Sequence, residues 1–170
     1  INQATWSQLS EILDRGLLIH VVGRRDWPIF QEQHLAHVLD LPTRLRERYC
    51  PVAYLHEEMP LALAAADLTV SRAGASTLGE FPVARLPSIL VPLPYTGVAQ
   101  KRNAEMLVEQ NGAVMVPDGM LSTQLVPTII KLLDSQSQRQ VMEQNLAEFA
   151  MPEAANRIAL ELHSLANMAD

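Results

Sequence analysis

Short runs of apolar residues alternate with longer amphipathic stretches along the first two thirds of the chain. The apolar runs lie at residues 17–22, 51–55, 68–71, 88–91 and 113–116. Runs of this length with few polar positions are typical of strands that are buried in a parallel sheet. We therefore expect five parallel strands in this order along the chain.

The stretches around these strands have the apolar spacing of helices. Trp6, Leu9, Ile12 and Leu13 fall on one helical face, and Gly16 follows as a stop signal. Further helices are expected at residues 30–38, 43–48, 61–66, 76–84, 99–110, 122–133, 137–149 and 153–168. Strands that alternate with helices in this way predict an α/β fold, in which helices cover both faces of one parallel sheet.

The composition narrows the class of protein. A length of 170 residues, 48% of them hydrophobic, is typical of one globular domain. The 13 Lys and Arg residues and 19 Asp and Glu residues give a formal charge of -6, which argues against non-specific binding of nucleic acid or of an anionic membrane. The single cysteine, Cys50, excludes an internal disulfide and favours a reducing, cytoplasmic compartment. No apolar run reaches the roughly 18 residues that would span a bilayer.

The loop at residues 71–80 runs from the third expected strand into a helix, and ligands of parallel sheets bind at such carboxyl ends. Its small residues, among them Gly74, let the backbone approach a ligand, and the N–H groups that begin the helix favour an anion. The segment therefore suits a phosphate or diphosphate. A capping box formed by Thr77 and Glu80 is the alternative explanation, although it does not account for Gly74 or Arg72.

Two further loops carry candidate polar groups. Residues 91–104 form a proline-stiffened loop and a helical turn with Gln100 and Asn103 on one face, where amides suit sugar hydroxyls; the alternative is a solvated helix start. The backbone around His56 is placed to read the edge of a flat base, or else simply begins a helix. His34 and His37 have no third ligand at a metal-like spacing, so we expect no metal site.

The three loops together resemble a known family. The segments 71–80 and 86–92 and the pair Gln100 and Asn103, in this order and spacing, closely resemble the C-terminal domain of the MurG family, glycosyltransferase family 28. Members of that family transfer N-acetylglucosamine (GlcNAc) from UDP-GlcNAc to the lipid-linked acceptor lipid I, which gives lipid II for peptidoglycan synthesis. The resemblance covers nearly the whole chain and implies the Rossmann-like donor half of a two-domain GT-B glycosyltransferase.

The resemblance implies a role for each candidate residue. Glu80 would hold the ribose hydroxyls of UDP, and the backbone at His56 would pair with uracil. Gln100 and Asn103 would bind the GlcNAc hydroxyls, although family members often have two adjacent glutamines where this chain has Ala99 and Gln100. Contacts with the diphosphate are implied for the N–H groups of Ala75, Ser76 and Thr77 and for the Thr77 hydroxyl, and support of the loop for Arg72 and Gly74.

The resemblance also implies what residues 1–170 lack. The family's C-terminal domain begins with a strand and a glycine-rich turn, which are missing here, and the family's N-terminal domain holds the lipid acceptor, the membrane contact and the catalytic base. We therefore expect residues 1–170 to be a C-terminal nucleotide-sugar-binding domain with no catalytic residue, cofactor or metal. The intact enzyme is expected to invert the anomeric centre and to lie on the inner face of a bacterial cell membrane.

Two other functions stay open on the sequence. The chain is alternatively a separate, non-catalytic subunit that binds a nucleotide sugar and needs a partner chain. It is otherwise part of a glycolipid synthase that uses UDP-galactose or UDP-glucose, because such relatives share the pattern of the loops.

Overall fold

Parallel strands form the centre of the molecule. The computed structural model describes residues 1–94 and 98–167. Strand β1 (Leu18–Val21) pairs with β2 (Tyr49–Val52), while β3 (Thr69–Ser71), β4 (Ser88–Leu90) and β5 (Ala113–Met115) form a second sheet in that order. The predicted α/β class is confirmed. The described strands form two sheets, however, rather than the single sheet that we expected.

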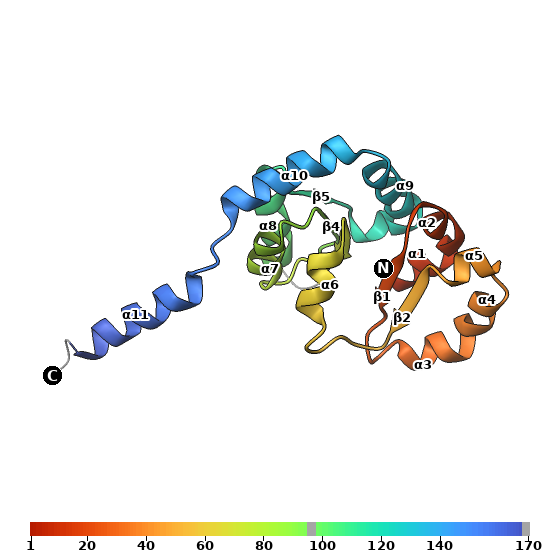
Figure 1. Ribbon diagram of the computed structural model, residues 1–170, viewed down its shortest axis with the longest axis horizontal. Helices are drawn as coiled ribbons and strands as arrows, with labels where there is room; N and C mark the ends of the chain where they lie inside the picture. Colours follow the sequence, from red (N-terminus) through yellow and green to blue (C-terminus); the bar gives the residue numbers. More distant parts are fainter. Residues whose placement is uncertain (95–97, 168–170) are drawn as a thin grey trace.

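Helices follow the strands in nearly the expected places (Figure 1). Their bounds are α1 (Asn2–Ser7), α2 (Leu9–Arg15), α3 (Trp27–Ile29), α4 (Leu35–Leu39), α5 (Thr43–Arg46), α6 (Met59–Ala65), α7 (Thr77–Ala84), α8 (Val98–Glu109), α9 (Leu121–Leu133), α10 (Gln136–Phe149) and α11 (Ala154–Asn167). The single helix expected at the start of the chain is broken at Gln8 into α1 and α2. A π-helical turn, η1 (Phe30–His34), joins α3 to α4, and a 3-10 turn, η2 (Asp118–Met120), precedes α9.

Strand β2 begins two residues before the expected strand at 51–55 and ends at Val52. The carbonyls of Arg48 and Val52 accept hydrogen bonds from β1, so Pro51 between them faces the outer edge of the sheet. A proline is tolerated there because no N–H is needed on that side. The prediction was wrong here because the apolar run continues past the point where pairing with β1 stops.

Helices cover both faces of the sheet that β3, β4 and β5 form. On one face, Ile89 and Val91 join an apolar cluster with residues of α1, α2 and α9. On the other face, Leu90 packs with residues of α7, α8 and α10. All three of these side chains are fully buried, which explains why the sequence of this strand shows an uninterrupted apolar run.

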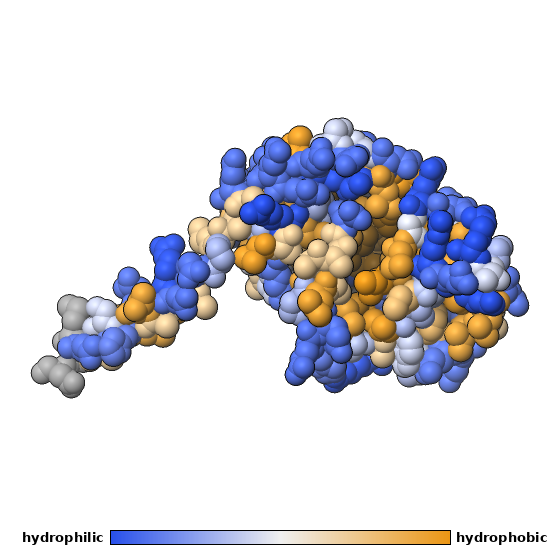
Figure 2. All heavy atoms as spheres, viewed as in Figure 1, coloured by the Kyte–Doolittle hydropathy of each residue, from blue (hydrophilic) through white to orange (hydrophobic). Residues whose placement is uncertain are grey.

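Among residues 1–94 and 98–167, side chains cover the sheet of β1 and β2 on one face and leave the other largely exposed. On the covered face Val22, Trp6, Phe30 and Tyr49 form an aromatic-rich cluster, whereas Ile19 on the opposite face is 40% exposed. Figure 2 shows apolar residues gathered in a hollow that lies between this part of the molecule and the rest. The second sheet is therefore the better packed of the two.

Helix α11 projects away from the two sheets (Figures 1 and 2). All of its residues are exposed, and Ile158, Leu162 and Leu165 are each more than 60% exposed. The predicted helix extends to Met168, which lies outside the described residues. Within residues 1–94 and 98–167, no helix is long and apolar enough to cross a membrane.

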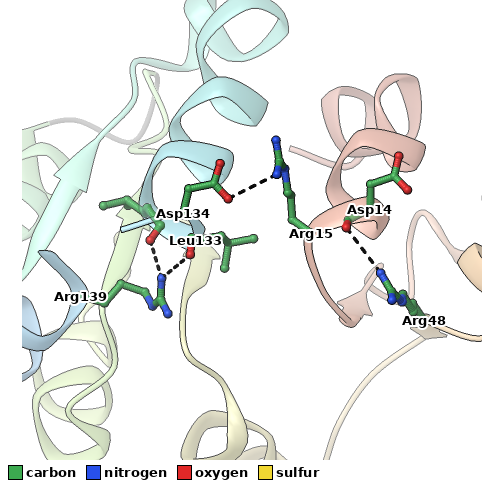
Figure 3. A network of polar contacts seen from close by, with 7 residues as sticks. Asp14, Arg15, Arg48, Leu133, Asp134 and Arg139 are labelled. Carbon is green, nitrogen blue, oxygen red and sulfur yellow. Dashed lines mark hydrogen bonds and ion pairs between the residues drawn. The ribbon is translucent and has the colours of Figure 1, made fainter. Parts of the chain in front are cut away.

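Helices α2 and α9 connect the two halves of the molecule through polar contacts as well as apolar ones (Figure 3). Arg15 of α2 forms an ion pair with Asp134 at the end of α9, with 3.6 Å between nitrogen and oxygen. Arg139 donates hydrogen bonds of 2.6 Å to the carbonyls of Leu132 and Leu133, which end α9. Cations at the end of a helix satisfy carbonyls that have no partner within the helix.

A buried histidine ties α1 to the first sheet. Only 7% of His20, which lies in β1, is exposed. Its Nε2 donates to Oδ1 of Asn2 at 3.1 Å, because an amide oxygen only accepts, and its Nδ1 therefore accepts from the hydroxyl of Tyr49 at 2.9 Å. Burial lowers the pKa of His20 to about 4 and raises the pKa of Tyr49 to about 12.

We predict that the protein loses stability as the pH falls from about 6.5 to about 4. In this range His20 gains a proton in the unfolded chain but stays neutral in the folded protein, so the lowered pKa costs about 2–3 kcal/mol of unfolding free energy at the acid end. Urea denaturation across this range tests the loss. His20→Gln should flatten the profile and His37→Gln, at an exposed position, should not; equal slopes in the wild type and His20→Gln would contradict the prediction.

Candidate functional site

The carboxyl ends of the two sheets meet around the start of α1. The side-chain amide of Asn2 donates to the carbonyl of Val22 and to the carboxylate of Asp26, both at 2.8 Å, just beyond β1. Arg72, beyond β3, lies close enough to residue 1 to interact with it electrostatically. The loops that follow β1 and β3 therefore lie on the same side of the molecule.

Arg72 holds three loops of this carboxyl edge together. Its guanidinium donates to the carbonyl of Val91 beyond β4 at 3.2 Å and forms an ion pair with Asp118 beyond β5 at 2.5 Å. Both charged side chains are about one third exposed (33% and 31%). These contacts join Arg72 to the loops beyond β4 and β5, and the supporting role that the resemblance implies for this residue stays a prediction.

The start of α7 differs from the capping box that the sequence suggests. Ser76 is the residue that precedes the helix, and no side chain caps the helix there. Instead Thr77 is buried, and both its hydroxyl (2.6 Å) and its N–H (3.2 Å) donate to the carbonyl of Gly74. The capping-box alternative is therefore wrong. The Thr77 hydroxyl, which was expected to contact a diphosphate, donates its hydrogen bond within the loop instead.

The outer part of the same loop presents free polar groups. Ala75, Ser76 and Glu80 are exposed. In the parts of the chain that the structure describes, the N–H groups of Ala75 and Ser76 and the carboxylate of Glu80 have no hydrogen-bond partner. A Cβ atom placed on Gly74 would have no neighbour within 4 Å, so packing within the domain does not require this glycine. The loop can accept an anion at its N–H groups and can bind hydroxyls at Glu80.

Gln100 and Asn103 of α8 are both half-buried, and one atom of each side-chain amide forms a hydrogen bond within the protein. The Oε1 atom of Gln100 accepts from the N–H of Leu93, and the Nδ2 atom of Asn103 donates to the carbonyl of Ala73, both at 3.0 Å. Among the described residues the second polar atom of each amide has no hydrogen-bond partner, so this atom can bind a ligand, since an amide offers both a donor and an acceptor group. Residues 95–97 of the expected sugar-binding loop lie outside the described residues.

His56 lies beyond β2 and is exposed. Its Nε2 atom is 2.9 Å from a guanidinium nitrogen of Arg24, which comes from the loop after β1. Its N–H donates to a carboxylate oxygen of Glu58 at 3.2 Å. A hydrogen bond from the Glu58 N–H and this one from the His56 N–H lower the pKa of Glu58. The backbone that was expected to read a base is therefore placed at the carboxyl edge, with its N–H directed at an oxygen acceptor.

Sequence reasoning missed Arg24, Tyr54 and Asp118. Arg24 and Asp118 each lie three residues after the end of a strand, β1 and β5, so their place after these strands was the available signal. Their partners are 32 and 46 residues away along the chain, and no local pattern shows such contacts. In residues 1–94 and 98–167, no group of three or more His, Cys, Asp or Glu side chains is arranged to hold a metal ion.

The parallel α/β fold, with its loops gathered at the carboxyl ends of the strands, is that of a Rossmann-like half of a GT-B glycosyltransferase. The sequence profile of the family described as "Glycosyltransferase family 28 C-terminal domain" matches residues 1–158. The chain therefore belongs to this family, and its recognition as MurG-like is confirmed.

Curated relatives carry the name UDP-N-acetylglucosamine--N-acetylmuramyl-(pentapeptide) pyrophosphoryl-undecaprenol N-acetylglucosamine transferase. The relative from Roseiflexus sp. (strain RS-1) is 36% identical over 97% of this chain, and that from Mycolicibacterium smegmatis is 38% identical over 94%. The matched segments make up only 41% and 39% of these relatives. The chain thus spans about two fifths of the length of the curated proteins that it matches.

Solved structures show the same fold. The crystal structure of Acinetobacter baumannii MurG matches with a TM-score of 0.70 at 22% identity, over 95% of this chain and 46% of that one. The spinosyn forosaminyltransferase SpnP matches with a TM-score of 0.54 at 13% identity, over 96% of this chain and 39% of that one. At these identities the likeness concerns the fold.

We predict that Arg72 and Asp118 stabilise the protein as a pair. Because the two side chains are partly shielded from water, a double-mutant cycle of Arg72→Ala and Asp118→Ala should give a coupling of about 1–2 kcal/mol in urea denaturation. The matched control is the pair Arg15 and Asp134, which is half exposed and 3.6 Å apart and should couple by less than about 0.5 kcal/mol. Equal coupling in the two cycles would contradict the prediction.

Proposed function

We propose that this chain is the donor-binding part of an enzyme that transfers GlcNAc from UDP-GlcNAc to lipid I and so forms lipid II. The observation that carries the proposal is the match of residues 1–158 to the glycosyltransferase family 28 C-terminal domain, together with relatives named as GlcNAc transferases. The exposed N–H groups and the free carboxylate in the loop at 71–80 support it, because they offer the contacts that a nucleoside diphosphate needs.

In this proposal the loop before α7 binds the UDP moiety. The N–H groups of Ala75 and Ser76 contact the diphosphate, and the carboxylate of Glu80 accepts hydrogen bonds from the ribose hydroxyls. Thr77 acts indirectly, because its hydroxyl and its N–H hold the carbonyl of Gly74 and so fix the turn. Arg72 fixes the other end of the loop through Val91 and Asp118.

The sugar then lies against the first turn of α8. The Nε2 atom of Gln100 donates to a GlcNAc hydroxyl, and the Oδ1 atom of Asn103 accepts from another, since the opposite atom of each amide is held by the protein. The backbone at His56 contacts the uracil edge. In the two amides, the atom that contacts the sugar is the one that forms no hydrogen bond with the described part of the protein.

The chemistry follows from the charge that develops on the leaving group. A base on the acceptor side takes the proton of the lipid I hydroxyl while this oxygen attacks the anomeric carbon, and the bond to the UDP oxygen breaks, which inverts the configuration. The N–H groups at 75 and 76 stabilise the negative charge on the departing diphosphate. We assign the base, the lipid acceptor and the membrane contact to a further domain of the intact protein.

The edges of β1 and β3 that pair with no other described strand support the assignment of the chain to part of a larger domain. The backbone of Leu18 and Val22 bonds to β2, so the alternate residues Ile19 and Val21 direct their N–H and C=O groups to the open edge of β1. Leu18 of β1 and Val70 of β3 both pack against one apolar cluster, which places the two open edges next to it. We propose that a strand that precedes residue 1 in the intact protein lies between β1 and β3.

We predict that Glu80→Ala weakens UDP-GlcNAc binding by about 1–3 kcal/mol, the scale of hydrogen bonds to a charged group. Calorimetric titration with UDP-GlcNAc, UDP-galactose and UDP measures this loss and the donor preference together. Glu109→Ala, at the far end of α8, is the control. Unchanged affinity would remove Glu80 from the site, and tighter binding of UDP-galactose would favour a glycolipid synthase.

We also predict that residues 1–170 alone bind the donor without transferring GlcNAc. An assay of lipid II formation from lipid I and labelled UDP-GlcNAc tests this, with a full-length relative as the positive control. Turnover by this polypeptide alone would show that the catalytic base lies within it.

A further inference from the structure

Arg24, Tyr54 and His56 form an exposed cluster at the carboxyl ends of β1 and β2. The guanidinium carbon of Arg24 lies 4.7 Å from the centre of the Tyr54 ring, and a guanidinium nitrogen lies 2.9 Å from Nε2 of His56. The rings of Tyr54 and His56 meet edge to face, with 4.7 Å between their centres. Each of the three side chains therefore contacts the other two.

The backbone of β1 and β2 brings these residues together. Val21 pairs with Val52 in the parallel register, so the residues that follow each strand meet at the same edge. Gly23 has a φ of +90°, a conformation that favours glycine, and it turns the chain so that Arg24 reaches the loop after β2. The contact thus depends on a turn that most other residues adopt only with strain.

The hydrogen-bonding chemistry of Arg24 determines the role of His56 in this cluster. A guanidinium only donates, so Nε2 of His56 is the acceptor in this contact. Tyr54 is 50% exposed, so the cluster buries little apolar surface. The cluster instead fixes the direction of the loop at residues 54–58. The backbone of this loop carries the candidate contact with the base.

The N–H of His56 already holds an oxygen acceptor in place. A carboxylate oxygen of the exposed Glu58 lies 3.2 Å from this N–H. A uracil carbonyl oxygen is an acceptor of the same kind, and it can take the position of this oxygen while the carboxylate moves into water. The occupied N–H therefore marks where the base edge would dock.

We propose that Arg24 is a positioning residue for recognition of the nucleobase. It holds Tyr54 and His56 so that the N–H of His56 faces the site, where a carbonyl oxygen of uracil replaces the carboxylate of Glu58. The inference rests on the proposed UDP site and adds to it the residue that sets selectivity for the base. A lysine cannot substitute, because it lacks the planar group that contacts a ring and an imidazole together.

Titration calorimetry with UDP, ADP and inorganic diphosphate tests the proposal on this chain. Arg24→Ala should weaken UDP binding about 5- to 20-fold and lower the preference for UDP over ADP, whereas the affinity for inorganic diphosphate stays the same. Arg24→Lys should lose most of the same selectivity. Arg25→Ala is the matched control, since Arg25 is also exposed and has no side-chain hydrogen bond, ion pair or ring contact among the described residues.

The outcomes separate the proposal from its alternatives. Unchanged UDP affinity in Arg24→Ala would overturn it, and so would equal losses for UDP and inorganic diphosphate, which indicate a general effect of charge. In ligand-free Arg24→Ala, we expect the melting temperature to stay the same and the amide resonances of His56 and Glu58 to shift. This combination would support the role of Arg24 as a positioning residue. A wild-type chain that binds neither UDP nor inorganic diphosphate would overturn the donor site itself, and this inference with it.

Discussion

An apolar cluster between α1, α2, β4 and α9 determines how the two halves of the molecule are placed. Ala4 and Ile12 pack there against Ile89, Val91 and residues of α9. The described strands form no hydrogen bonds between the two sheets, so this burial fixes their relative position, helped at the surface by the ion pair of Arg15 and Asp134. Because the cluster sets the sheets with their carboxyl ends on one side, loops from both can contribute to one site.

The candidate site depends on polar groups that serve the fold and the ligand at once. The amides of Gln100 and Asn103 each use one atom to hold a neighbouring loop, and a free amide atom that is positioned in this way loses little entropy on binding. Thr77 and Arg72 hold the backbone of the loop from its two ends. The exposed N–H groups of Ala75 and Ser76 are therefore held in place for the anion that we propose they bind.

Much of the fold follows from the sequence, because buried parallel strands and amphipathic helices leave strong periodic patterns. The strands at Leu18, Thr69, Ser88 and Ala113 begin within one residue of the predicted positions. The prediction for β2 was wrong because the apolar run does not show where pairing with β1 ends. The loop at 71–80 was found from its small residues, whereas the capping box suggested for it does not form, since Thr77 turns inward to Gly74.

By itself, the sequence determined the α/β class, the order of the elements and the loops that carry the candidate site. These features are local, because the periodicity of a segment and the small residues after a strand act within a few positions. The tertiary structure decided that the strands form two sheets, that Arg72 joins Asp118 and that Arg24 holds His56. Such contacts join residues dozens of positions apart, and only the packing of the elements brings their atoms within hydrogen-bond distance.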